Sequence, residues 1–290
     1  MKKNKNRKSW RIIAAISIAL SLTVNAAFSQ EQETAPKRSL QVNLQAHGNF
    51  SELFYGKNSS LVQSLPLSTF TIEGSGMDKI GSTYFFVDLE VGNASNLKNK
   101  MLGGTYIEFA REWCFWGNSK AAALTIHTEF DAGVGYGGDS WGSTGNGFEF
   151  KTALLGGLSY SWFGDKYFFQ IQALNRYELK DYYGCGGEGW QLTFVYSYEP
   201  VKWFTLAGYA DFWQNPIDGT GVKSLKRERS FHFAIEPYVW FNVTDYLSIG
   251  SRLRFTYNNY MGLVDELENI VDYDRKAYFA PTIALKWNMN

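Results

Sequence analysis

The residues of this chain that could act on another molecule are charged and polar side chains spread along its whole length. Many recur at every second position, as His127 and Glu129 or Arg252 and Arg254 do. This spacing places side chains on the same face of a β-strand. Acids, amides and bases that share such a face can orient a small polar solute by hydrogen bonds. The candidates for a solute-binding constriction are Asp88, Glu108, His127, Gln172, Tyr209, Glu236 and Arg252.

Hairpin geometry predicts two contacts between these candidates, because residues equidistant from a turn face each other in antiparallel strands. A turn centred near Thr244 places Glu236 opposite Arg252, and a turn centred near Asn118 brings Glu108 close to His127. Two interpretations remain open for these pairs. They form either a constriction that orients a solute or a salt-bridged structural plug.

Other motif-like strings are better explained by structure than by chemistry. The residues from Gly138 to Gly142 match the G-x-S-x-G spacing of a nucleophile elbow, but the helix that this motif requires does not follow. Residues 184–189 are rich in glycine but lack the Lys-Ser/Thr of a phosphate loop. The acidic residues from Asp265 to Asp274 are a candidate calcium site, for which a solvated loop is the simpler explanation. We therefore expect no metal, no cofactor and no catalytic residues.

The candidate residues must be positioned by β-strands, because polar and apolar residues alternate in segments of about ten residues from Leu40 onward. For example, Phe85 and Val87 share one face of a segment, and Asp88 and Glu90 share the other. About ten residues is the length with which a tilted strand crosses a bilayer. The predicted strands lie near residues 40–50, 65–73, 80–91, 103–113, 121–131, 148–162, 167–178, 190–199, 203–213, 231–241, 246–257 and 277–287.

The connections between these strands alternate in length. The short ones lie near residues 74–79, 116–120, 163–166, 200–202 and 242–245, and longer connections rich in Gly, Asn and charge lie between them. Short periplasmic turns and long outer loops are typical of outer-membrane barrels. Large aromatic residues gather at both levels, as in two interfacial girdles, with Trp113, Trp162, Trp203, Trp240 and Trp287 at the short-turn end. The sequence therefore predicts an all-β fold, an antiparallel up-and-down transmembrane β-barrel of about twelve strands.

The first residues have the features of an export signal. Basic residues up to Arg11 precede an apolar run from Ile12 to Leu22 and small residues up to Ser29. That run is about eleven residues long, short of the roughly twenty that span a membrane as a helix. We therefore expect a signal peptide over residues 1–29 and the barrel over residues 30–290. Without the six basic residues of the leader, the chain carries 22 basic and 28 acidic residues, a balance that disfavours nucleic-acid binding.

The cysteines and two prolines give further expectations. The strand plan separates Cys114 and Cys185 by the roughly 30 Å hydrocarbon layer, whereas a disulfide needs Cα atoms within about 7 Å. Both cysteines are therefore expected to be free. Pro237 and Pro281 fall inside predicted strands, where the missing N–H removes a ladder hydrogen bond, so we expect β-bulges at both.

Four segments carry a resemblance to a known group of proteins: residues 81–88, 106–113, 210–213 and 236–241. They resemble an uncharacterised family of outer-membrane barrels that is similar to the Tsx-like nucleoside-specific channel-forming proteins. The resemblance implies a twelve-stranded monomeric channel that takes up nucleosides or similar small solutes. It carries over no binding residue.

Two other functions remain open. An outer-membrane lipid-modifying enzyme would need Ser and His on the lipid-facing side, whereas the predicted faces point His47, His127 and His232 inward. A structural or surface-binding barrel would have its lumen plugged by charge pairs. The leading expectation is a porin-like channel in the cell outer membrane that contacts outer-membrane lipid, takes up nucleoside-like solutes by passive, selective diffusion, and is neither an enzyme nor a nucleic-acid-binding protein.

Overall fold

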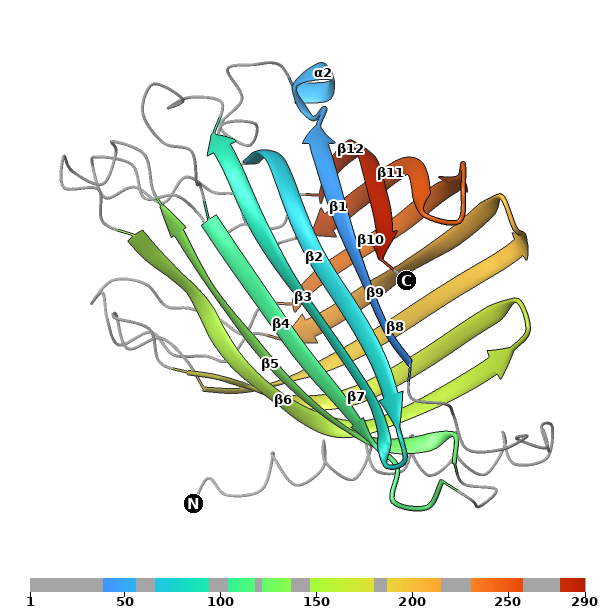
Figure 1. The fold of residues 1–290 in the computed structure, drawn as a ribbon. Helices are drawn as coiled ribbons and strands as arrows, with labels where there is room; N and C mark the ends of the chain where they lie inside the picture. The colour runs from blue at the N-terminus through green and yellow to red at the C-terminus, as the bar shows by residue number, and fades with distance from the viewer. Residues whose placement is uncertain are drawn as a thin grey trace, which may run out of the picture.

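Twelve antiparallel strands close into one barrel in the part of the chain that the computed structural model describes (Figure 1). The described residues are 39–55, 66–93, 104–117, 122–136, 147–179, 187–214, 231–257 and 277–289. Each strand pairs with its sequence neighbours, and β1 pairs with β12 to close the ring. The predicted fold class is confirmed.

The strands are β1 Ser39–Asn49, β2 Pro66–Asp78, β3 Gly81–Asn93, β4 Gly104–Trp113, β5 Leu124–Tyr136, β6 Gly147–Gly164, β7 Tyr167–Glu178, β8 Gly187–Val201, β9 Phe204–Gln214, β10 Phe231–Asn242, β11 Leu247–Tyr257 and β12 Ala277–Met289. One short helix, α2 (Glu52–Tyr55), follows β1. No helix among the described residues is long and apolar enough to cross a membrane.

The barrel has an apolar outside and a polar inside, the reverse of a water-soluble protein. Large apolar side chains such as Phe109 and Leu158 are about half exposed, at 49% and 48%. Fully buried side chains include His127 and Glu236, each 1% exposed. Because side chains alternate along a strand, this pattern places the polar set in the barrel interior, here called the lumen. The predicted faces are confirmed for these residues.

The short connections all lie at one end of the barrel. β2 and β3 are joined by residues 79–80, β6 and β7 by residues 165–166, and β8 and β9 by residues 202–203. The start of β1 and the end of β12 lie at the same end, because an even number of strands returns the chain to its starting level.

β2 is longer than the sequence predicted. It was expected to end near residue 73, but it continues to Asp78 and pairs with β3 along its whole length. The predicted turn at residues 74–79 is therefore wrong, and the turn is residues 79–80. Gly74 and Gly76 hide the alternation in the sequence, yet their backbones still pair with Phe85 and Thr83.

The expected bulge at Pro237 is wrong. β10 keeps one register with β11 on both sides of the proline, from Ile235 opposite Phe255 to Tyr238 opposite Arg252. On the other side Pro237 lies opposite Gly208, whose φ is +149°. A Cβ at Gly208 would lie 2.2 Å from the carbonyl oxygen of Glu236. The glycine therefore lets β9 approach β10 closely.

The expected bulge at Pro281 is also wrong, since β11 and β12 keep one register across it. Next to the proline, the side chain of Thr282 forms hydrogen bonds to the backbone of Arg252 in place of backbone–backbone bonds. Its hydroxyl accepts a hydrogen bond from the Arg252 N–H and donates one to the Arg252 carbonyl, both at 3.1 Å. Register shifts occur instead between Asp131 and Gly133 and between Tyr198 and Val201.

Exposed aromatic side chains lie near both ends of the barrel, as the two girdles predicted. Trp203 and Trp287 are 60% and 51% exposed near the short turns, and Tyr177 and Tyr257 are exposed at the opposite ends of their strands. Trp240 departs from the prediction. It is only 2% exposed because it shares the inner face of β10 with Glu236 and Tyr238, and His47 packs edge-on against it.

Several sequence predictions fall on residues that the structure does not describe. These are the signal peptide over residues 1–29, Cys185, the Ser140 string, residues 184–186 of the glycine-rich segment and the acidic segment 265–274. Cys114 is described, and it is free as predicted.

Candidate functional site

The seven predicted constriction residues all lie on strands of the barrel, but they do not form one ring. Asp88, Glu236 and Arg252 belong to a first group, His127 and Gln172 to a second, and Glu108 to a third. We call the groups the arginine cluster, the histidine cluster and the acidic cluster.

The arginine cluster consists of Asp88, Glu236, Arg252 and Arg254. The carboxylate of Glu236 binds both guanidinium groups, Arg252 through Oε2 and Arg254 through Oε1. The predicted Glu236–Arg252 contact is therefore confirmed, although in the strand register Arg252 lies opposite Tyr238. Arg252 also reaches Asp88 of β3, with 3.5 Å between Nη1 and Oδ2. Because three strands separate β3 from β11 in the ring, this ion pair spans part of the lumen.

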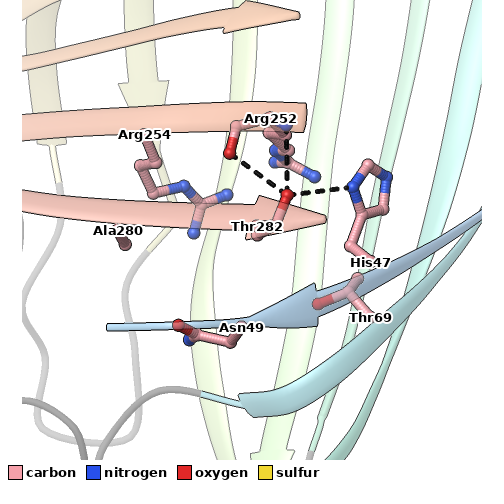
Figure 2. Close-up of a pocket in the computed structure, with 7 residues that line it drawn as sticks. All are labelled: His47, Asn49, Thr69, Arg252, Arg254, Ala280 and Thr282. Carbon is pink, nitrogen blue, oxygen red and sulfur yellow. Dashed lines mark hydrogen bonds between the residues drawn. The ribbon is translucent and has the colours of Figure 1, made fainter. Parts of the chain in front are cut away.

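A small pocket of about 40 Å³ opens beside this cluster (Figure 2). It is lined by His47 and Asn49 of β1, Thr69 of β2, Arg252 and Arg254 of β11, and Ala280 and Thr282 of β12. In Figure 2 the hydroxyl of Thr282 is held between the Arg252 backbone and His47 Nδ1, which is 3.5 Å away. Gln45 fixes the other ring nitrogen of His47 at 3.0 Å. The pocket thus offers donors and acceptors that are already held in place.

The histidine cluster consists of Glu112, His127, Gln170 and Gln172. Glu112 Oε1 lies 2.6 Å from His127 Nδ1, and the side-chain amide of Gln170 donates to it at 3.1 Å. The amide of Gln172 donates to the same oxygen at 3.4 Å. Since β5 and β6 lie between β4 and β7, these bonds connect parts of the wall that are not adjacent.

The predicted contact between Glu108 and His127 is wrong. In the register of β4 and β5, Glu112 lies opposite His127, and Glu108 lies opposite Asp131. The centre of the β4–β5 connection falls between residues 119 and 120, not at Asn118, which moves every pair along by three positions. Glu108 instead joins Glu129 and Asp131 in the acidic cluster, whose carboxylate oxygens lie within 4.8 Å of one another.

Tyr209 lies directly opposite Glu236 on the neighbouring strand β9. Residues opposite each other in an antiparallel pair share a face, so Tyr209 faces the lumen beside the arginine cluster. Tyr238 lies on the same wall, with the guanidinium of Arg252 5.7 Å from its ring centre. The two rings provide flat surfaces next to the charged groups.

Sequence reasoning missed several residues of this wall. Thr282 and Asp131 were not among the candidates, nor was Thr193, which donates to Asp211 at 2.6 Å. Strict alternation would have found them, since Asp131 is two residues from Glu129 and Thr282 is four from Lys286. No sequence signal shows that three carboxylates meet in the acidic cluster, because that depends on register.

The described side chains are arranged for binding. Donors and acceptors from all twelve strands line the wall, most of them are already hydrogen-bonded to each other, and the pocket lies among them. The Thr282 hydroxyl donates to the Arg252 carbonyl at 3.1 Å and lies 3.5 Å from His47 Nδ1.

Comparison with known proteins places most of the chain in one family. The model of the family described as "Domain of unknown function (DUF5020)" matches residues 41–289. No curated protein matches the chain significantly in sequence.

Solved barrels are similar only at a low level. The NanC porin has a TM-score of 0.44 and 9% identity, over 85% of this chain and 98% of that chain. LpxR from Salmonella typhimurium has a TM-score of 0.42 and 8% identity, over 86% and 99%. An anion-selective porin from Comamonas acidovorans has a TM-score of 0.36 and 9% identity, over 87% and 78%.

Proposed function

The chain belongs to the DUF5020 family, and for this member we propose an outer-membrane channel for the passive, selective uptake of small polar solutes such as nucleosides. The observation that carries the proposal is a lumen wall of paired charges with a polar pocket in it, inside a barrel whose outer surface is apolar. A polar lumen within a lipid-facing belt is the construction of a diffusion channel.

The character of the pocket favours a neutral polar solute. Arg252 and Arg254 both form ion pairs with Glu236, and Arg252 also forms one with Asp88. A free anion would have to compete with these carboxylates, whereas a hydroxyl or amide group can hydrogen-bond to Asn49, Thr69 or the arginines without separating the ion pairs. This wall therefore suits a sugar-like or amide-bearing molecule.

The nucleoside assignment is supported by Tyr209 and Tyr238 on the same wall. A base can stack on a tyrosine ring while polar groups bind its edge and ribose. The apolar belt, with Trp203 and Trp287 near one rim and Tyr257 near the other, supports the outer membrane as the location and its lipid as the partner. We propose that the barrel acts as a monomer and binds no nucleic acid.

We further propose that the protein is not a lipid-modifying enzyme. Such an enzyme needs its base at the lipid surface, whereas His47, His127 and His232 are 3%, 1% and 7% exposed. A second candidate is a structural barrel with a plugged lumen. It is favoured by the ion pair between Arg252 and Asp88, which spans part of the lumen and narrows any passage.

Single-channel recording separates these functions. The mature chain is refolded, inserted into a planar bilayer, and measured with and without adenosine or uridine. Current steps that nucleosides block support the selective channel. Silence at all voltages contradicts it and favours the plugged barrel. Current that no nucleoside affects supports a channel with another solute.

A further inference from the structure

The acidic cluster places three carboxylates together on the lumen wall. Glu108, Glu129 and Asp131 each offer one oxygen, and the three oxygens lie within 4.8 Å of one another. Asp131 is only 3% exposed. Ionised carboxylates at this separation repel one another, and the repulsion grows as burial removes water. A nearby positive charge is therefore needed to offset the repulsion among the three carboxylates.

The basic residues described near the acidic cluster supply too little positive charge. Arg176 binds Asp131 at 3.2 Å, but the same guanidinium also binds Glu178 at 3.2 Å. His127 lies 3.0 Å from Glu129, but its other nitrogen is bound to Glu112. Glu108 lies directly opposite Asp131 on the neighbouring strand, so it adds a further acid to the group.

One oxygen of the cluster is also left without a partner. Arg176 takes Oδ2 of Asp131, and Oδ1 is buried with no hydrogen-bond partner among the described residues. Buried carboxylate oxygens are nearly always bonded, so an orphan oxygen beside two other carboxylates indicates a missing positive ligand. This observation concerns hydrogen bonding and is separate from the proximity of the three acids.

We propose that Glu108, Glu129 and Asp131 bind one Ca²⁺ ion in the lumen wall. Calcium takes carboxylate oxygens at roughly 2.3–2.6 Å, so two ligands on opposite sides of the ion are about 4.6–5.2 Å apart. Oxygens that all lie within 4.8 Å of one another can therefore reach one calcium ion without rearrangement. The bound ion offsets two of the three negative charges of the cluster and connects β4 to β5.

Calcium titration tests the site directly. The refolded, EDTA-treated barrel in detergent is titrated with CaCl₂ by calorimetry, and its thermal unfolding is recorded with and without the ion. We expect one ion per barrel with a Kd below about 1 mM and a higher Tm in calcium. Glu108→Gln combined with Asp131→Asn should weaken binding by about tenfold or more, since affinity follows the number of charged ligands.

Glu73→Gln is the matched control, because Glu73 bonds Gln45 outside the cluster; it should bind calcium as the wild type does. Glu108→Gln alone keeps Asp131 with Arg176 and is the variant to use if the double variant does not fold. Absence of binding in the wild type overturns the proposal and indicates a shared proton instead. Equal affinity in the cluster variants overturns it too. Neither result depends on conductance, so a failure of the calcium site can be distinguished from a failure of the proposed channel function.

Discussion

Glu236 binds Arg252 across the β10–β11 pair although the two residues are not opposite each other in the register. Arg252 lies opposite Tyr238, and the contact is diagonal. The diagonal leaves Glu236 able to bind Arg254 as well. Arg252 then reaches on to Asp88 of β3, so one carboxylate organises the wall that contains the pocket.

Replacement of Glu236 should therefore be costly. Glu236→Gln leaves two guanidinium groups without their main partner in a wall where Glu236 is 1% exposed. Removing one partner of a buried ion pair costs about 3–5 kcal/mol. Urea titration of the barrel in detergent measures the loss. The exposed Glu199→Gln should stay within about 0.5 kcal/mol of the wild type; similar losses in both variants would contradict a specific role of Glu236.

Tyr209→Ala tests whether nucleosides stack beside the arginine cluster. Stacking on an aromatic side chain contributes roughly 1–3 kcal/mol, so the nucleoside concentration for half-block should rise about 5- to 150-fold. The conductance without solute should remain. Tyr198→Ala removes an outward-facing ring that is 42% exposed and should leave the block unchanged. An unchanged block in Tyr209→Ala would remove this ring from the binding site.

Gly208→Ala should destabilise the barrel more than the addition of a single methyl group would suggest. Gly208 has a φ of +149°, and a Cβ there would lie 2.2 Å from the Glu236 carbonyl oxygen. We expect a loss of more than about 1 kcal/mol from the backbone conformation alone, seen as a lower unfolding temperature on heated SDS gels. At Gly48 the nearest atom to a new Cβ is 3.8 Å away, so Gly48→Ala should behave as the wild type. Equal behaviour of the two variants would show that the close approach of β9 to β10 is not needed.

The apolar outer surface predicts that the loss of stability caused by a charged side chain on it depends on the depth of that side chain in the bilayer. Phe109 lies in the middle of β4 and is 49% exposed, whereas Trp287 lies near the end of β12. Phe109→Arg should cost about 2–4 kcal/mol in lipid vesicles, and Trp287→Arg about 0–1 kcal/mol. Reversible guanidinium unfolding in vesicles measures both. A loss at Trp287 as large as at Phe109 would argue against a lipid-facing belt.

Much of the fold could be predicted from the sequence because each strand carries its own evidence. Alternation in β3 and β7 marks which side chains face inward without reference to any other strand. The inward face of Asp88, Gln172, Glu236 and Arg252 followed from this. The end of β2 and the conformations at Pro237 and Pro281 could not be predicted, because they depend on partners such as Gly208 and Thr282 on neighbouring strands.

The sequence by itself determined the number of strands, the face of each side chain and the end at which the short turns lie. Only the tertiary structure decided which inward residues meet. A shift of three positions between β4 and β5 turned the expected Glu108–His127 contact into Glu112–His127 and brought Glu108 beside Asp131 and Glu129. The physical reason is that alternation is local to one strand, whereas register is set by turns and by pairing along both edges of each strand.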